Sequence, residues 1–242
     1  MATAGDDIID QIANRCVEKC QDWAWFMEDL TPGKAQAFML QHSIRNRLYS
    51  ASWRPAWMSR CPDQAIVRKT IGQMLEELVY DDNIKAAHTK ILWEMGRNVG
   101  LSDQQLNDAA PTPIVDLYCN IQENLCRNRH WIIGWLSTSI DEFVLVALNG
   151  KQETNMSYKK WMKDLGLTEE QLFFFTYHEQ ADMEHAGKKV WRPLQKHVTS
   201  DELAADVLAG LDTALNAATL FYKGVSELGD QLDAAGASLI AA

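Results

Sequence analysis

The sequence predicts an all-α protein. It contains 13 glycines and 6 prolines, about 8% of the 242 residues, whereas average usage of the two is roughly 12%. Long stretches contain neither residue, and no segment alternates apolar and polar residues as a half-buried strand would. We therefore expect one helical domain over residues 1–242, without internal repeats or low-complexity linkers.

Turn-forming residues divide the chain into segments of helical length. In chain order, the dividing points are Thr31-Pro32-Gly33, Arg54-Pro55, Cys61-Pro62-Asp63, Pro111-Thr112-Pro113, Asn149-Gly150 and Ser200-Asp201. About eight helices result. Two helix starts place a hydroxyl three residues before an amide, namely Ser102 with Gln105 and Thr168 with Gln171. This spacing is typical of a capping box.

Aromatic side chains crowd two parts of the chain, the first quarter and a short run near residue 174. Large rings at helical spacing usually fill the space between helices, so we expect most of them in the core. These residues are Trp23, Trp25, Phe26, Tyr49, Trp53, Trp57, Phe173, Phe174 and Phe175.

The charge of the chain disfavours nucleic acid and anionic membranes as partners. The net charge is −10, and the segment from Asp201 onward carries seven acidic residues against Lys223 alone. Affinity for phosphate-bearing surfaces depends on Lys and Arg, so this field would repel them. We interpret the acidic tail as a solvated helix face.

Other features favour a reduced, cytoplasmic protein that does not span a membrane. No run of 18 apolar residues occurs, and the N-terminus lacks the charge and apolar core of a signal peptide. Five cysteines are an odd count that suits free thiols.

A histidine motif carries the strongest chemical signal. His178, Asp182 and His185 stand at i, i+4 and i+7, which places them on one face of a helix. Two imidazoles and a carboxylate are suitable ligands for iron, manganese or zinc. The alternative is the polar surface face of an amphipathic helix.

Two upstream segments would complete a larger ligand set. Asp81 and His88 are seven residues apart, so a helix would place them on one face. Glu142 lies among apolar residues, where a carboxylate is costly to bury unless it is paired or binds a cation; its alternative is a surface acid. Together the segments offer three imidazoles and three carboxylates, the count of a dinuclear site in a helical bundle. We assign the remaining histidines to the surface or to satisfied core positions: His42, His130 and His197.

This pattern resembles the haem-oxygenase-like di-iron oxidases and oxygenases, relatives of the TenA/PqqC-like helical bundle. The family pattern is a carboxylate, six residues, His, then Glu, then His-x3-Asp/Glu-x2-His, and the resemblance covers about residues 65 to 190. It implies a bundle of seven or more helices, two Fe(2+) per chain, O₂ as co-substrate and a peroxo-di-iron intermediate. By the same resemblance, His88 and His178 hold one iron, Asp182 and His185 hold the other, and Asp81 and Glu142 are terminal or bridging ligands.

The chain departs from the family pattern at three positions. Asp81 stands where Glu is common, and Glu77, four residues earlier, is an alternative first carboxylate ligand. Lys85 replaces the Glu of the fatty-acid decarboxylase branch, and Asp141 replaces the Tyr of the p-aminobenzoate branch. Both branches are therefore disfavoured.

Four arginines provide a clue to the substrate: Arg45, Arg47, Arg54 and Arg60. A buried arginine can bind a carboxylate through two hydrogen bonds. We therefore expect a small carboxylate substrate, preferably an amino acid, and an electron donor. The reaction would be desaturation, oxidative C–C or C–N cleavage or hydroxylation, in specialised metabolism. Alternatively, the arginines pair with the acidic tail or with Glu76 and Glu77.

Other classes of protein remain open at this stage. A metal-independent TenA/PqqC-like enzyme of cofactor metabolism and a non-catalytic helical binding protein both fit the bundle. A true haem oxygenase would need a proximal histidine near the N-terminus, but the first histidine is His42. The sequence leaves the oligomeric state open, with a homodimer among the options.

Overall fold

The computed structural model describes residues 8–140, 144, 154–178 and 191–239, and this part of the chain is helical without a strand. The all-α prediction is confirmed. In chain order the elements are α1 (Ile8–Cys20), η1 (Ala24–Phe26), α2 (Pro32–Leu48), η2 (Tyr49–Trp53), α3 (Arg54–Met58), α4 (Gln64–Leu78), α5 (His88–Asn98), α6 (Asp103–Asp108), α7 (Pro113–Asn128), α8 (Trp131–Ser137), α10 (Tyr158–Leu165), η3 (Arg192–Lys196) and α13 (Asp201–Ala234).

Side chains cap the helices at most of the predicted dividing points. Thr31 caps α2, Asp63 caps α4, Thr112 caps α7 and Ser200 caps α13, each by accepting a backbone N–H of the first turn. The capping box at Ser102 is present. At Thr168 and Gln171 the reciprocal bonds also form, but the helix begins only at residue 173.

The dividing point at Arg54-Pro55 does not end a helix. Residues from Pro32 to Met58 form α2, the π-helical turn η2 and α3 without a break, and the N–H of Arg54 bonds to the carbonyl of Tyr49, five residues earlier. Proline lacks an N–H and clashes with the preceding turn of an α-helix. A π-helical turn at this point lets the chain continue past Pro55.

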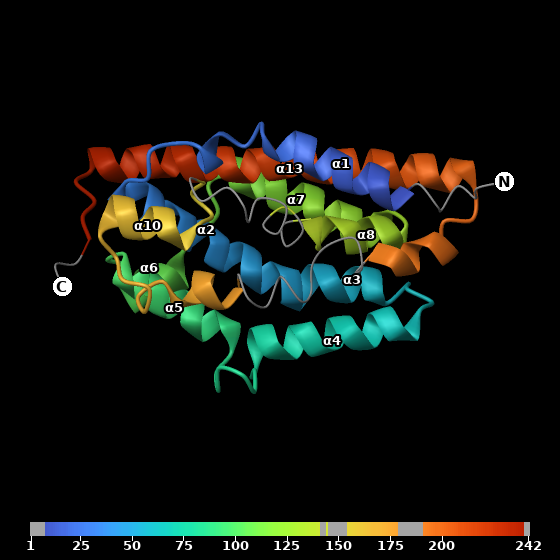
Figure 1. Cartoon of the computed structure of the whole chain (residues 1–242), viewed down its shortest axis with the longest axis horizontal. Helices are drawn as coiled ribbons and strands as arrows, with labels where there is room; N and C mark the ends of the chain where they lie inside the picture. The colour runs from blue at the N-terminus through green and yellow to red at the C-terminus, as the bar shows by residue number, and fades with distance from the viewer. Residues whose placement is uncertain (1–7, 141–143, 145–153, 179–190, 240–242) are drawn as a thin grey trace.

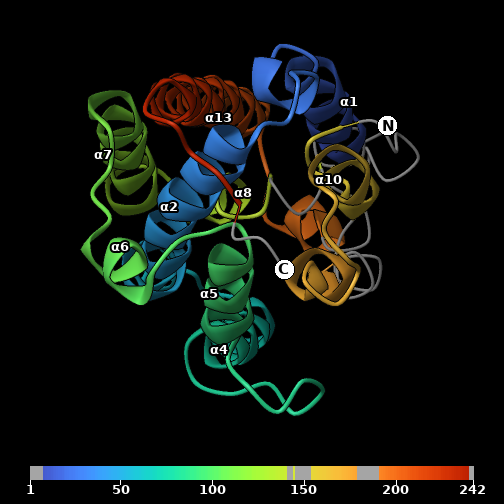
Figure 2. The same cartoon turned by 90° about the vertical axis from the view of Figure 1, so that its left-hand side faces the viewer.

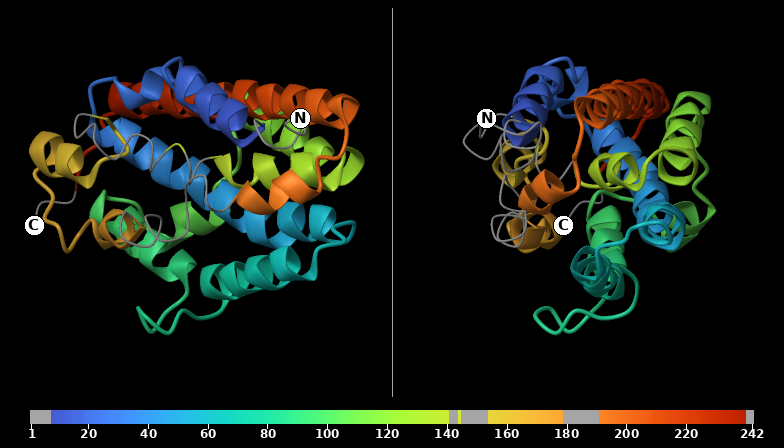
Figure 3. Two further views of the ribbon diagram at one scale, coloured as in Figure 1. Left: turned by 45° about the vertical axis from the view of Figure 1, so that its right-hand side comes forward. Right: turned by 90° about the vertical axis from the view of Figure 1, so that its right-hand side faces the viewer.

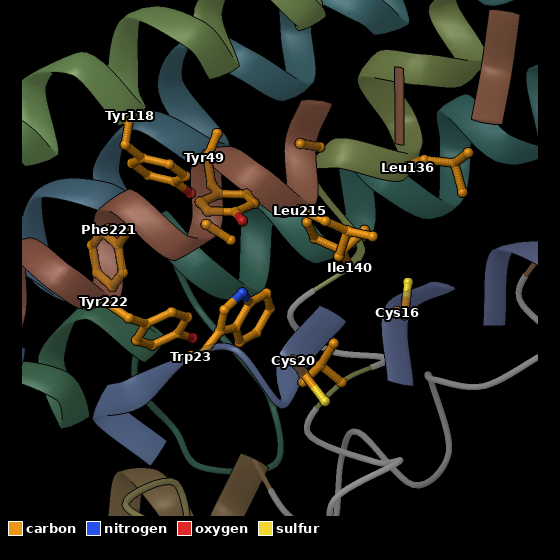
Figure 4. Close-up of a cluster of buried hydrophobic side chains, with 14 of the residues drawn as sticks. Cys16, Cys20, Trp23, Tyr49, Tyr118, Leu136, Ile140, Leu215, Phe221 and Tyr222 are labelled. Atoms are coloured by element: carbon orange, nitrogen blue, oxygen red, sulfur yellow. The ribbon is translucent and has the colours of Figure 1, made fainter. Parts of the chain in front are cut away.

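The long helix α13 organises one side of the bundle. It packs mainly against α2 and α7, with further contacts to α1 and α8 (Figures 1 and 2). Figure 4 shows part of the aromatic core that results. Tyr222 of α13 stacks on Trp23 with ring centroids 4.9 Å apart, and Phe221 lies 5.2 Å from Tyr118 of α7. Most of the predicted core aromatics are buried, whereas Phe173 is exposed.

Among the described helices, α13 is long and apolar enough to cross a membrane by length and composition. Its most apolar 18-residue window has a mean hydropathy of 1.2, and 44% of that window is buried inside the bundle. These two properties are weak support for a membrane span, because the core helix of a soluble protein shares them.

Asp63 ties the start of α4 to η3 and should make stability depend on pH. Its carboxylate lies 2.6 Å from Nζ of Lys196 and 3.0 Å from Nε2 of His197, and these contacts hold its pKa below the usual range. A carboxyl whose pKa is lower in the folded state stabilises the fold above its unfolded pKa, near 3.9, and loses this effect as the pH falls.

We therefore expect Asp63→Asn to destabilise the chain at pH 7, and the difference from wild type to shrink as the pH falls from about 5 to about 2. Urea unfolding at a series of pH values measures this difference. Asp201→Asn, in the first turn of α13, is the control and should give a smaller difference from wild type at pH 7. A difference at Asp63 that stays constant across this range would contradict the expectation.

Candidate metal centre

Three described side chains from separate parts of the chain meet in one cluster. Glu77 stands at the end of α4, His88 is the first residue of α5, and His178 belongs to the helical residues 173–178. One ligand atom from each lies within 4.8 Å of the others. The cluster therefore offers a carboxylate oxygen and two imidazole nitrogens to a single point.

The two nitrogens of His88 face different carboxylates. Nε2 lies 2.8 Å from Oδ2 of Asp81, so it is the nitrogen that carries the proton and donates it. Nδ1 is buried 3.4 Å from Oε1 of Glu77 without hydrogen-bond geometry. A buried polar atom without a hydrogen bond is unusual and needs an explanation. Here, Nδ1 is the nitrogen directed toward the cluster.

Asp81 is itself held in place. Its side chain is only 2% exposed, and it accepts hydrogen bonds from the Tyr177 hydroxyl and from the N–H of Asn83. A carboxylate that holds the outer nitrogen of a ligand histidine fixes the tautomer and the ring orientation. Asp81 is therefore placed to support His88.

His178 presents its other nitrogen to the cluster. Its Nδ1 donates to the carbonyl of Phe174 at 2.7 Å, so Nε2 is left unprotonated in the neutral ring. Burial lowers the pKa of His178, which keeps it neutral. The ring packs 4.2 Å from the ring of Phe174 and 4.9 Å from that of His88. A neutral imidazole is the form that binds a metal.

The electrostatics of the cluster favour a bound cation. Burial opposes the charge on Glu77, but His88 and Arg54 outweigh it and lower the pKa of Glu77 to about 2. Burial also opposes charge on His88, yet Glu77 and Asp81 raise its pKa to about 9. The carboxylates of the cluster therefore favour a proton on His88. A metal ion that binds His88 would replace this proton.

The donor set fits non-haem iron. Two histidines and one carboxylate are the ligands typical of non-haem Fe(II) oxygenases. Glu77, Nδ1 of His88 and Nε2 of His178 are the atoms that would hold the ion. The buried, unbonded Nδ1 of His88 supports this assignment.

The structure corrects one expectation about Asp81 and His88. They do not share a helix face, because α4 ends at Leu78 and α5 begins at His88. Asp81 lies in the loop between them, where its side chain accepts the N–H of Asn83 in a turn typical of Asp and Asn. The loop still brings Asp81 to His88, and the Thr89 hydroxyl bonds to the carbonyl of Glu77.

The other predicted ligands lie outside the described residues. Glu142, Asp182 and His185 fall in segments that the structure does not describe, so their ligand roles stay predictions. Of the described candidates, His88 and His178 lie in the cluster, and Asp81 contacts the outer nitrogen of His88. Glu77, the alternative carboxylate, is the one that joins them.

His42 lies close to the cluster, which no motif in the sequence indicated. Its ring lies 5.0 Å from that of Phe38 and 5.6 Å from that of Phe174, and its Nδ1 accepts a hydrogen bond from Arg45. Burial, together with the charges of Arg45 and His178, lowers the pKa of His42 well below the usual value. His42 stands nine residues after Gly33 on α2, and no sequence motif in this stretch predicts that His42 lies beside the cluster.

The fold is shared with solved structures, among them the following two. One is a domain of unknown function with a heme oxygenase-like fold from Shewanella denitrificans OS217, with a TM-score of 0.65, 14% identity, and 98% of this chain and 95% of that chain covered. The other is a TenA homolog from Pseudomonas syringae pv. tomato DC3000, with a TM-score of 0.62, 10% identity, and 91% and 90% covered. At these identities the likeness shows the fold alone. No curated protein matches the chain significantly.

A family model extends the comparison to the chemistry. The model described as iron-containing redox enzyme matches residues 37–219, which include Glu77, His88 and His178. This match covers well over half of the 242 residues. The chain therefore belongs to the family of iron-containing redox enzymes, and it has the haem-oxygenase-like fold.

Proposed function

We propose that this chain is a non-haem di-iron oxidase or oxygenase that uses O₂ to oxidise a small carboxylate-bearing substrate, preferably an amino acid. The main observation behind the proposal is the cluster of Glu77, His88 and His178, with His88 buried, in a chain of an iron-containing redox family. The reaction class remains desaturation, oxidative C–C or C–N cleavage or hydroxylation. An electron donor and a cytoplasmic location belong to the same proposal.

The proposal of a second iron is based on the sequence pattern. Asp182 and His185 follow His178 at helical spacing, and Glu142 is an acid among apolar residues. A helix continuing from residues 173–178 would place Asp182 and His185 on the face that carries His178. These three residues would supply the ligands that a second ion needs beside the first.

The residues around the cluster would position the ligands and exclude water. Asp81 and Tyr177 hold His88, and the carbonyl of Phe174 holds His178. The buried ring of Phe174 packs against His178, and Phe175 packs against Phe174, so these rings would shield that side of the site from bulk water. Bound iron would supply the electrons that activate O₂ and the oxidising power for the substrate.

The arginines support a carboxylate substrate to different degrees. Arg60 donates to the carbonyls of Cys126 and Arg129, which is a structural role. Arg45 and Arg54 are buried, and each guanidinium lies 5.7 Å from the ring centroid of Tyr49. Arg54 also acts on the charge of Glu77, in line with the alternative that these arginines neutralise acids of the chain. A positive interior beside the cluster would favour a small anionic substrate.

The cysteines argue against a thiol-based alternative. All five cysteines are buried. Burial raises the pKa of Cys119 to about 11 and that of Cys126 to about 12. A nucleophilic cysteine needs a lowered pKa and access to substrate. A thiaminase-like reaction through one of these two thiols is therefore disfavoured.

Anaerobic titration with ferrous iron tests the proposal. We expect two irons per chain by elemental analysis, and loss of tight binding in His178→Ala, because that change removes a ligand and leaves a cavity in its place. His130→Ala, at the start of α8 away from the cluster, is the matched control and should bind iron as wild type does. Exposure to O₂ in a stopped-flow spectrometer, with amino acids and fatty acids as candidate substrates, should then give a transient visible band.

The outcomes separate the parts of the proposal. One iron per chain would contradict the dinuclear site but would agree with a single metal ion bound at the cluster. No iron uptake, with no effect of His178→Ala, would contradict the metal centre and favour a metal-independent relative. A band triggered only by fatty acids would contradict the amino-acid preference.

A further inference from the structure

A hollow of about 220 Å³ lies between α4, α8 and η3, and we call it the α4–α8 hollow. The three elements lie in the same half of the bundle (Figures 1 and 3). Ile66, Thr70 and Gln73 line it from α4, Trp135 from α8 and Pro193 from η3. Pockets for drug-sized molecules measure roughly 300–1,000 Å³. The α4–α8 hollow is smaller, so it fits a ligand about the size of one amino acid.

One end of the α4–α8 hollow lies next to the metal cluster. Four residues share one face of α4, because they are spaced by four, three and four positions: Ile66, Thr70, Gln73 and Glu77. The first three line the hollow, and the fourth belongs to the cluster. Gln73 is one helical turn from Glu77, about 6 Å along the axis. A ligand in the hollow would therefore lie beside an ion held by Glu77.

Lys69 supplies the hollow with a cation. It lines the hollow from one flank of α4, and it forms no ion pair with the described residues of the chain. The other charges of the hollow are already paired, since the carboxylate of Asp63 lies 2.6 Å from Nζ of Lys196 and 3.0 Å from Nε2 of His197. Lys69 is therefore the group that can bind the carboxylate of a ligand.

Two other groups of the hollow can accept hydrogen bonds from an ammonium. The hydroxyl of Ser139 donates to the carbonyl of Trp135 at 2.9 Å, so the lone pairs of its Oγ can still accept. The side chain of Gln73 forms no hydrogen bond with the described residues, and its Oε1 is an acceptor. Ile66, Trp135 and Pro193 add apolar surface. This combination matches an amino acid with an apolar side chain.

A second hollow beside the cluster carries the opposite charge. It has a volume of about 490 Å³ and lies between α5 and residues 170–173. Ile91 and Met95 line it from the face of α5 that carries His88. Glu94 and Glu170 line it as well, and two carboxylates repel an anionic ligand. Charge therefore favours the α4–α8 hollow for a carboxylate.

We propose that the α4–α8 hollow is the substrate site and binds an amino acid with an apolar side chain, whose carboxylate pairs with Lys69. Gln73 and Ser139 hold its ammonium. This inference rests on the proposed function, because it takes the metal cluster as the reactive centre. It assigns the substrate carboxylate to Lys69 and not to the buried Arg45 and Arg54, which lie outside the lining of the hollow.

Isothermal titration calorimetry of the full, iron-loaded chain without oxygen tests the site. The probes are L-leucine, L-phenylalanine and L-tryptophan, of which at least one should bind. Lys69→Gln should raise its dissociation constant about 10-fold, because a charge-assisted hydrogen bond is lost. Lys69→Arg keeps the charge and should retain most of the affinity. Arg68→Gln is the matched control, since Arg68 is the exposed neighbour on α4 outside the lining, and it should bind as wild type does.

Ligands without an amino group test the ammonium contacts. The corresponding acids are 4-methylpentanoate, 3-phenylpropionate and 3-(indol-3-yl)propionate. The acid that matches the bound amino acid should bind more weakly to wild type, and this difference should shrink in Gln73→Leu, which removes an acceptor from the hollow. An equal difference in wild type and Gln73→Leu would contradict the role of Gln73.

The iron content of the same samples separates this inference from the proposed function. Lys69→Gln should bind as much iron as wild type, because Lys69 offers no ligand atom to the cluster. Iron uptake without binding of any of the three amino acids would overturn the substrate site and leave the metal centre intact. Equal losses of affinity in Lys69→Gln and Arg68→Gln would also overturn it, because general charge would then explain the binding. Failure of iron uptake would contradict the metal centre instead.

Discussion

Replacing Glu77 with glutamine should lower the affinity for ferrous iron by more than the roughly 10- to 100-fold that is typical of lost outer-shell partners. Glu77 brings the carboxylate oxygen of the cluster, and its pKa of about 2 keeps it ionised at neutral pH. Glutamine keeps the size of the side chain but removes the charge that attracts the cation. Equilibrium titration under anaerobic conditions measures the change.

The neighbouring residue gives a matched control. Glu76 is adjacent in sequence but lies outside the cluster of Glu77, His88 and His178. Glu76→Gln should leave the iron affinity within about twofold of wild type, since Glu76 offers no ligand atom to the cluster and its charge is partly screened by solvent. Equal losses in the two variants would show that general charge, rather than ligation by Glu77, controls iron binding.

Asp81 provides the decisive contrast. If Asp81 supports His88 through Nε2, then Asp81→Asn should reduce iron affinity by about 10- to 100-fold without abolishing binding. Removing its hydrogen-bond donor with Tyr177→Phe should have a smaller effect in the same direction. Loss of an iron in Asp81→Asn, with full binding in Glu77→Gln, would return Asp81 to the ligand role that the family pattern implies.

The fold was largely predictable from local signals. Scarce glycine and proline predict the helices, and Thr31, Asp63, Thr112 and Ser200 mark four of their starts, because a cap acts within one turn of the chain. The π-helical turn at Tyr49–Trp53 was not predictable, since Pro55 usually ends a helix. The packing of α3 on α7 and α8, and of the π-helical turn on α7, favours a chain that continues past Pro55.

The metal cluster was predictable in its residues but not in its geometry. The spacing of Asp81 and His88 indicated a shared site, yet their contact arises from a loop and not from a helix face. The turn residues Asp81-Asp82-Asn83 were the available signal for that loop. The choice between Glu77 and Asp81 depends on which nitrogen of His88 faces which carboxylate, and this is a tertiary property that spacing cannot supply.

The close crossing of α2 and α13 predicts the second large effect, a loss of folding stability when a side chain is added at the crossing. A Cβ at Gly229 would stand 2.7 Å from Cα of Lys34, and Gly33 faces the backbone of α13 in the same way. Asp233 of α13 accepts the N–H of Gly33 at 2.7 Å and the hydroxyl of Thr31, so it fixes the first turn of α2. Gly229→Ala must push these backbones apart, at a cost of about 1–3 kcal/mol in the free energy of unfolding.

The control for this change is a glycine without neighbours. Gly72 lies within α4 with no atom near its Cβ position, so Gly72→Ala should stabilise the chain by up to about 1 kcal/mol through helix propensity. Urea unfolding of dilute protein compares the two variants, and equal changes at both positions would contradict the close crossing. The crossing at Gly33 is also distant from the metal cluster. Gly33 is nine residues from His42, the residue of α2 that lies close to the cluster, and this separation is about 14 Å along the helix. Gly229→Ala should therefore destabilise the fold while the folded fraction keeps its iron affinity.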